Sequence, residues 1–368
     1  MKTTEEIKEE LRKKVFDPVL TDKDFVSTGS TLLNLAISGN PYWGFAKGKF
    51  YQFVGDSTSG KTFFCLTCFA EASINPNFEG YRFIFDDVEG GALMDIRKFF
   101  GKTVAEKIEA PRTEKGEPIY SATVEDFYYN VDDAIQEGKP FIYVLDSMDA
   151  LSSRDEDAKF DQMKKAHRKN KETTGSVGDG KAKKNSGNIR KLLKGLRKTK
   201  SILIIIGQTR DKINIGWAAR FDPETKSISG GRSLKFYATL QMWSSVQRKI
   251  TKEINGKKRE LGTYCKVQIK KNRITGKDRS IVIPIYHSVG IDDLGSCVDF
   301  LLEEFHWKKK KGLGNGIMAE DLGLKGSREQ LVHKIEKKGY EKNLIAIVKD
   351  VWDKIEKQCE IIRKSKYG

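Results

Sequence analysis

The segment from Gly55 to Thr62, GDSTSGKT, fits the pattern G-x-x-x-x-G-K-[ST] of a loop that binds nucleotide phosphates. It follows the apolar run FYQFV and precedes the apolar helical pattern FFCLTCFAEA, so strand, loop and helix come in the order that this chemistry needs. Backbone N–H groups and the positive end of a helix attract phosphate oxygens. The sequence therefore predicts a nucleoside triphosphate site lined by Gly55, Asp56, Ser57, Thr58, Ser59, Gly60, Lys61 and Thr62.

Two residues of this loop have distinct expected roles. Lys61 should reach the β and γ phosphates, and the hydroxyl of Thr62 should hold Mg²⁺. The metal also needs an acidic partner at the end of a neighbouring strand, and the run PFIYVLDS supplies Asp146. We therefore expect ATP with Mg²⁺, the metal held by Thr62 and Asp146.

Hydrolysis of a triphosphate also requires a carboxylate that orients or activates water. The segment FIFDDVEGG, at the end of another apolar run, offers Asp86, Asp87 and Glu89. Spacing alone does not rank these three acids. Each could instead be an ordinary turn or capping residue at the end of a strand.

Short apolar runs that alternate with helical patterns between Lys49 and about Gly290 must position these residues. Continuous apolar runs are typical of strands buried on both faces. The sequence therefore predicts an α/β fold with a mostly parallel central sheet flanked by helices. The runs are FYQFVG, YRFIFDD, PFIYVLDS, SILIIIGQ, ATLQMWSS, TYCKVQIKK and SIVIPIY.

Two polar segments interrupt this alternation. Residues 152–187 lack apolar periodicity, which favours a mobile basic loop over a packed element. Residues 209–232 combine cations for phosphates with aromatic rings for base faces, as a loop that binds single-stranded DNA without reading its sequence would. The alternative is that the rings pack beneath the loop. The side chains concerned are Arg210, Lys212, Trp217, Arg220 and Phe221.

The overall composition limits the class of protein. The 67 Lys and Arg residues exceed the 51 Asp and Glu residues, and the net charge of +16 attracts polyanions such as nucleic acid. No run approaches the roughly 20 apolar residues of a membrane span, so we expect a cytoplasmic protein without a membrane partner. The odd number of cysteines, five, argues against a disulfide framework. Cys65 and Cys68 are expected to be buried helix residues.

Single hydrophobic cores stop growing beyond roughly 250–300 residues. A chain of 368 residues is therefore expected to form two unequal domains. We predict an N-terminal oligomerisation arm at 1–26, a nucleotide-binding core at 27–304 and a small α-rich C-terminal domain at 305–368. Helices are expected at 327–338, with a capping box of Ser327 and Gln330, and at 341–364.

Several blocks, in order, resemble the RecA family of DNA strand-exchange recombinases over roughly residues 27–300, and more weakly over 305–355. The resemblance departs at Ser233, where alanine is usual, and at Gln241, where arginine is frequent. The enlarged 152–187 segment and the basic C-terminus suggest a divergent or phage-type member. The matching blocks are STGSTLLNLAISG, FDDVEGGALMD, LDSMDAL, RKLLKGLRKTKSILIIIGQTRDKI, SGGRSLKFYATLQ, KKNRI and IPIY.

The resemblance implies roles for individual residues. It selects Glu89 as the general base, Gln208 as the sensor of the γ-phosphate, and Asp95 and Tyr286 as contacts near the nucleotide base. It assigns Lys271 and Arg273 to the ATP of a neighbouring subunit. It adds as DNA contacts Arg190, Gly230, Gly231 and Arg232.

The activity implied by this resemblance is ATP-dependent homologous recombination. The protein would form a helical filament on single-stranded DNA, pair it with homologous duplex DNA, and hydrolyse ATP in response to DNA. A single-strand-binding protein or loader is a further expected partner, and the C-terminal domain could capture duplex DNA. The expected location is the nucleoid, or the host cytoplasm for a phage protein. The alternatives are a hexameric RecA-like helicase and a recombination mediator that binds DNA without exchanging strands.

Overall fold

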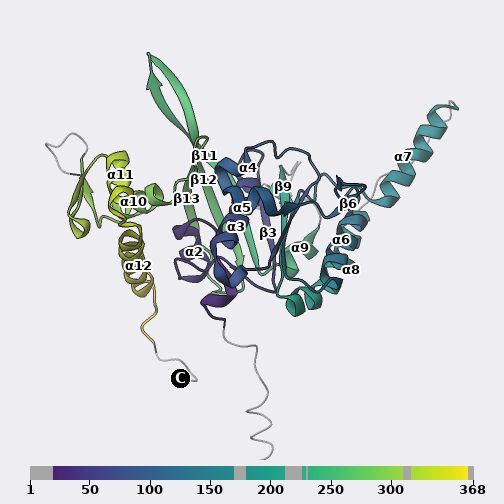
Figure 1. The fold of residues 1–368 in the computed structure, drawn as a ribbon, viewed down its shortest axis with the longest axis horizontal. Coiled ribbons are helices and arrows are strands. Elements are labelled where there is room, and N and C mark those ends of the chain that lie inside the picture. The colour runs from purple at the N-terminus through teal and green to yellow at the C-terminus, as the bar shows by residue number, and fades with distance from the viewer. Residues whose placement is uncertain (1–19, 170–179, 212–225, 229–230, 310–315, 364–368) are drawn as a thin grey trace, which may run out of the picture.

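A large mixed sheet forms the centre of the computed structural model, which describes residues 20–169, 180–211, 226–228, 231–309 and 316–363 (Figure 1). In these residues the sheet has ten strands in the order β14-β13-β12-β11-β3-β9-β8-β4-β5, with β10 paired to β9. The strands are β3 (Phe50–Gly55), β4 (Arg82–Asp87), β5 (Ile108–Glu109), β8 (Phe141–Asp146), β9 (Ile202–Asp211), β10 (Lys226–Ile228), β11 (Leu240–Ile254), β12 (Lys257–Asn272), β13 (Ser280–Tyr286) and β14 (Gly290–Ile291).

The strands from β5 to β11 in this order are all parallel to their neighbours. Strands β12, β13 and β14 continue the sheet with antiparallel pairing. This arrangement confirms the predicted α/β fold with a mostly parallel sheet, and every apolar run named above is a strand. Strands β11 and β12 extend well beyond their apolar runs, joined by Asn255 and Gly256 with φ angles of 54° and 69°, which suit a tight hairpin turn.

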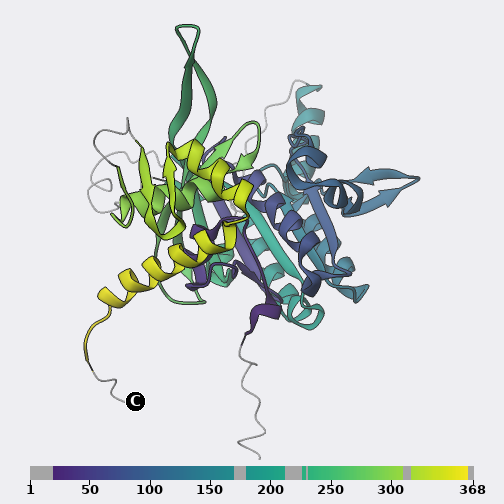
Figure 2. The same cartoon turned by 60° about the vertical axis from the view of Figure 1, so that its left-hand side comes forward.

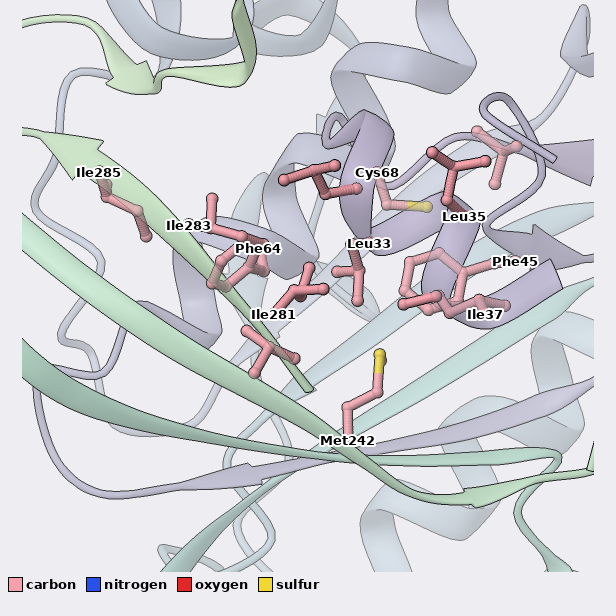
Figure 3. Packing of buried hydrophobic residues seen from close by; sticks show 14 of the residues in the cluster. Leu33, Leu35, Ile37, Phe45, Phe64, Cys68, Met242, Ile281, Ile283 and Ile285 are labelled. Carbon is pink, nitrogen blue, oxygen red and sulfur yellow. The ribbon is translucent and has the colours of Figure 1, made fainter. Parts of the chain in front are cut away.

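Helices cover both faces of the sheet. One face packs against α2 (Thr31–Ser38), α3 (Lys61–Ile74) and α10 (Asp293–Glu303), and the other against α6 (Val124–Gln136), α8 (Gly180–Thr199) and α9 (Arg232–Tyr237). Ile204 of β9 contributes to the first layer and Ile205 to the second, so successive side chains point to opposite faces. Figure 3 shows the first layer, where Leu33 of α2 and Phe64 of α3 lie above Met242 of β11.

The remaining described elements are short or lie at the edges. Among all the described residues, no helix is long and apolar enough to cross a membrane. The elements are β1 (Phe25–Val26), β2 (Phe45–Ala46), β6 (Arg112–Glu114), β7 (Glu117–Ile119), α4 (Ile96–Phe100), α5 (Lys102–Lys107) and the 3-10 turns at Asp22–Asp24, Pro76–Phe78 and Glu320–Leu322.

The prediction of a loop at 152–187 is wrong for residues 154–167 and 180–187, which are helical. Helix α7 (Arg154–His167) projects from the body of the protein (Figure 1) and has no buried residue. It begins at a capping box of Ser153 and Glu156, and its acidic first turn and basic last turn complement the helix dipole. The N-terminal half of α8 packs through polar contacts, such as that of Tyr128 Oη with Asn185 Oδ1 at 2.9 Å, which an apolar pattern cannot reveal.

The C-terminal region combines a small sheet with two helices. Strands β15 (Lys308–Lys309), β16 (Ile317–Ala319) and β17 (Leu324–Gly326) precede α11 (Arg328–Lys338) and α12 (Glu341–Gln358). The predicted capping box of Ser327 and Gln330 is confirmed, while α12 ends six residues before the predicted boundary at 364. Arg328 binds Asp292 at 2.9 Å and Asp299 at 2.8 Å, which ties α11 to α10. Residues 1–19 of the predicted arm lie outside the described residues.

The carboxylate of Asp293 joins α10 to α2. Asp293 accepts hydrogen bonds from the amide of Thr31 at 2.6 Å and from its hydroxyl at 2.7 Å. Burial raises the pKa of Asp293 to about 6 despite these two bonds. The folded protein therefore binds this proton more tightly than the unfolded chain, in which the pKa of Asp is about 3.9.

The pH dependence of stability follows from this difference. Between about pH 4 and pH 6 the folded state holds a proton at Asp293 that the unfolded state has lost, so stability falls as the pH rises through this window and then levels off. Asp293→Asn, which stays neutral, should be more stable than the wild type at pH 8 by up to about 3 kcal/mol, with little difference near pH 4. Urea denaturation at both pH values measures this, and a variant less stable at pH 8 would contradict it.

Candidate nucleotide site

Most of the residues predicted to act on a nucleotide lie at one edge of the sheet. Gly55 at the end of β3 is paired with Gln208 of β9, and Asp87 at the end of β4 is paired with Asp146 at the end of β8. Because β3, β9, β8 and β4 are parallel, their carboxyl ends meet at the same edge. Open α/β sheets bind ligands at this edge.

The loop after β3 depends on residues without side chains. A Cβ atom at Gly55 would lie 2.3 Å from Oγ of Ser244 and 2.4 Å from its carbonyl oxygen. Gly60 has a φ of 80°, and a Cβ atom there would lie 2.7 Å from Cδ1 of Ile285. Ser59 Oγ lies 2.7 Å from both the carbonyl oxygen of Asp56 and Oγ of Ser244. The loop is thus held against β11 and β13.

Lys61 is folded back onto this loop. Its ammonium group donates a hydrogen bond of 2.6 Å to the carbonyl oxygen of Asp56. Burial lowers the pKa of Lys61, while the carboxylates of Asp146, Glu89 and Asp56 oppose that effect. A buried ammonium with a neutral carbonyl acceptor is a site for a more strongly charged acceptor such as a phosphate.

Thr62 and Asp146 form the oxygen-rich part of the site. The Thr62 hydroxyl donates a hydrogen bond to the Asp146 carboxylate. The pKa of Asp146 is raised to about 6, mainly by burial and also by the charges of Glu89 and Asp87, against the opposing effects of the Thr62 bond and Lys61. A hydroxyl and a carboxylate suit Mg²⁺. Within the described residues no cluster of three His, Cys, Asp or Glu side chains could hold a metal by itself, and Mg²⁺ commonly takes water and phosphate as its other ligands.

The structure separates the three acids that spacing could not rank. Asp86 is buried and accepts hydrogen bonds from the backbone amide of Ser121 at 2.9 Å and from Tyr143 Oη at 2.6 Å. Asp87 accepts two bonds of 3.2 Å from amides of the following turn, at 91 and 92. Both acids thus have structural partners. Only Glu89 of these three lies against Gln208.

Glu89 and Gln208 form a direct contact across the site. Nε2 of Gln208 donates to Oε1 of Glu89 at 3.0 Å, and the hydroxyl of Ser147 donates to the same oxygen. The backbone amide of Gln208 donates to Asp149 Oδ2 at 2.7 Å. The predicted base and the predicted sensor are therefore neighbours, held by Ser147 and Asp149 of the LDSMDAL block.

A second unpredicted contact links the loop to the end of β9. The hydroxyl of Thr209 donates a hydrogen bond to Oδ1 of Asp56. Thr209 also pairs with Ile228 of β10, so the chain that leaves the sheet after β9 returns beside it. The base of the 209–232 segment is thus bound to the nucleotide loop. The type of Thr209 alone carries no signal that would have indicated this contact.

Lys271 and Arg273 lie at the opposite end of β3 from the nucleotide loop. Both donate to the carbonyl of Phe236 at the C-terminus of α9, at 2.6 and 2.8 Å. Burial, together with the charges of Arg273 and Lys235, lowers the pKa of Lys271 to about 8. The amide of Arg273 bonds to Thr239, whose own amide bonds to Phe50, five residues and ~17 Å from Gly55. These two cations therefore do not reach the loop of their own chain.

Three other predicted residues have local roles or stand apart. Asp95 caps α4 by accepting a bond of 2.9 Å from the amide of Lys98. Tyr286 lines a groove beside Arg328 of α11. Arg190 is exposed on α8, and its Nε donates to the carbonyl of Ser186 at 3.1 Å. None of these contacts involves the loop.

Most of the predicted DNA loop lies outside the described residues, namely Lys212, Trp217, Arg220, Phe221 and Gly230. For Arg210 in β9 and Arg232 in α9 only the backbone is described. Gly231, with a φ of 85°, precedes the first residue of α9. Cys65 and Cys68 are buried on α3 as free cysteines, as expected.

Known proteins match most of this chain. The family profile of the RecA N-terminal domain matches residues 13–292. Protein RecA of Chlorobaculum parvum is 29% identical over 311 residues, covering 81% of this chain and 75% of the relative. Protein RecA of Cytophaga hutchinsonii is 29% identical over 303 residues, covering 79% and 72%. With a family match over most of its length, the chain belongs to the RecA family.

Proposed function

We propose that this protein is an ATP-dependent DNA strand-exchange recombinase that assembles on single-stranded DNA. Family membership suggests a recombinase-like function and an ATPase domain that hydrolyses ATP. The observation that carries the finer proposal is the hydrogen bond of Gln208 to Glu89, beside the bond of Thr209 to the nucleotide loop. These contacts join the edge of the sheet that carries Glu89 to the start of 209–232, the segment expected to hold DNA.

The nucleotide would enter where Lys61 now bonds to the loop backbone. Lys61 then exchanges the Asp56 carbonyl for the β and γ phosphates, which are stronger acceptors. Thr62 and Asp146 would hold Mg²⁺, which when bound neutralises phosphate charge. Glu89 orients the attacking water and accepts its proton. Gln208, released from Glu89 by a γ-phosphate, carries the change to Thr209 and the following loop.

Lys271 and Arg273 would complete the site of the next subunit. Their position at the far end of β3 separates them from the loop of their own chain. Stacked copies would bring that end over a neighbour's loop. Such head-to-tail contacts are heterologous, and they form open helices when the rotation does not close. The predicted filament follows. Arg190 and the 209–232 segment would then track the single strand, and the N-terminal arm would link subunits.

Replacing Glu89 with Gln should lower DNA-stimulated ATP turnover by about 100-fold or more, since general-base catalysis contributes at least that much. The amide keeps the size of the side chain and one oxygen, so affinity for ATP should change little. Phosphate release and nucleotide binding measure the two effects. The matched control is Glu106→Gln on the exposed surface of α5, which should behave as the wild type. Unchanged turnover in Glu89→Gln would assign the base elsewhere.

A mixing experiment tests the shared site. Lys61→Ala disables a chain's own loop but leaves its Lys271 and Arg273, while Lys271→Ala combined with Arg273→Ala does the reverse. Each variant alone should be inactive. An equal mixture should recover about a quarter of wild-type turnover, because one in four random neighbour pairs combines an intact loop with intact cations. A mixture as inactive as its components would show that the cations act within their own chain.

Strand exchange itself is the decisive assay. With ATP, Mg²⁺ and homologous single-stranded and duplex DNA, the wild type should produce joint molecules and Lys61→Ala should not. Electron microscopy of the same mixture should show helical filaments. Closed rings without filaments would indicate a hexameric motor, and DNA binding without joint molecules would indicate a mediator.

A further inference from the structure

The hairpin formed by β11 and β12 extends far beyond the sheet. Strand β3 pairs with β11 only from Leu240 to Ser244, and β13 pairs with β12 only from Gly262 to Gln268. The rest projects from the body as a two-stranded ribbon (Figures 1 and 2). Every residue from 251 to 260 is exposed. The ribbon therefore contributes little to the core.

The two faces of this ribbon carry different charges. Lys252 lies opposite Arg259, and Ile254 lies opposite Lys257. Directly opposed residues share a face, and alternate residues of a strand return to it. We call these four residues the basic face: they carry three cations and no acid. Within the described part of the chain, no ion pair involves these three cations.

The opposite face is electrically balanced. Lys249 forms an ion pair of 2.6 Å with Glu260, and Glu253 lies opposite Lys258. We call these four residues the balanced face. Both faces are exposed to solvent at the tip. Solvation alone would not separate the charges in this way.

The cross-strand pair of Lys252 and Arg259 has an energetic consequence. Like charges directly opposite each other weaken a β-ribbon, whereas opposite charges, as on the balanced face, stabilise it. An anion placed over the basic face removes the repulsion. The ribbon is therefore better matched to a bound polyanion than to free solution.

The dimensions of the ribbon favour duplex DNA as this polyanion. Alternate residues on one strand lie ~7 Å apart and the two strands ~5 Å apart, so the three cations form a narrow row. A two-stranded ribbon fits the major groove, which is ~12 Å wide and bordered by phosphates. A lipid surface would call for an apolar face, but Ile254, 43% exposed, is the single apolar residue among the four.

We propose that the basic face of the β11–β12 ribbon binds the phosphates of duplex DNA. It is a contact separate from the 209–232 segment and from the C-terminal domain. That the ribbon binds a polyanion follows from its charges; that this polyanion is duplex DNA rests on the proposed function. In a filament, every subunit presents one such ribbon to incoming duplex, and the contact is independent of base sequence because it involves phosphates.

Two double variants of equal charge test the proposal. Lys252→Gln with Arg259→Gln removes two cations from the basic face, and Lys249→Gln with Lys258→Gln removes two from the balanced face. Fluorescence anisotropy of a labelled duplex, measured over a salt series, reports affinity for both. The basic-face variant should bind roughly tenfold or more weakly at low salt, with a salt slope lower by about 1.8 per bound chain, and the balanced-face variant should resemble the wild type.

A charge reversal separates binding from folding. Lys252→Glu places opposite charges across the ribbon, so its amides should exchange hydrogen no faster than in the wild type, while duplex binding weakens further. Weaker binding with faster exchange in the ribbon would mean that the substitution disrupts the hairpin, and the proposal would lose this support.

The outcomes that overturn the proposal are distinct. Equal loss in the two double variants would show an effect of net charge only, and no loss in either would remove the ribbon from DNA binding. If a polyglutamate peptide binds as tightly as duplex and loses affinity in the basic-face variant alone, the surface serves an acidic protein instead. ATP turnover stimulated by single-stranded DNA is measured in parallel: its absence in the wild type refutes the proposed function, whether or not the two faces differ.

Discussion

The parallel alignment of β4, β8, β9 and β3 is the constraint on which the rest of the molecule depends. It brings the ends of four strands, spread over the sequence from Gly55 to Asp211, to one edge of the sheet. The close approach of Gly55 to Ser244 then sets where the nucleotide loop can turn. A side chain at Gly55 would push the loop off β11 and misplace Lys61 and Thr62 together, because both follow on the same rigid turn into α3.

Much of this arrangement could be predicted because it depends on local patterns. Buried strands appear as apolar runs, and the loop pattern combines glycines, a lysine and a hydroxyl in fixed order. The choice among Asp86, Asp87 and Glu89 could not be made from the residues alone. All three lie within four positions at the end of β4. What separates them is the hydrogen-bond partner: Tyr143 for Asp86, amides of the following turn for Asp87, and Gln208 for Glu89.

The failures have equally physical causes. The segment 152–187 was expected to be a loop since it lacks apolar periodicity, yet α7 needs no buried face and is specified by Ser153 and its charge distribution. The N-terminal half of α8 is held by polar bonds, including that of Lys184 with Asp155 at 2.8 Å. The length of the β11–β12 hairpin was also missed, because the strands on either side of the turn at Asn255 are mostly charged and lack a continuous apolar run.

The separation of Lys271 and Arg273 from the nucleotide loop has a consequence for assemblies of finite length. If each chain lends these cations to its neighbour, a row of n chains contains n − 1 complete sites, and the chain at one end keeps an unfinished one. Short rows would then be poor catalysts for each chain they contain, and one tip would retain its nucleotide longest. The two ends of such a polymer would differ chemically, which gives it an intrinsic direction of growth and loss.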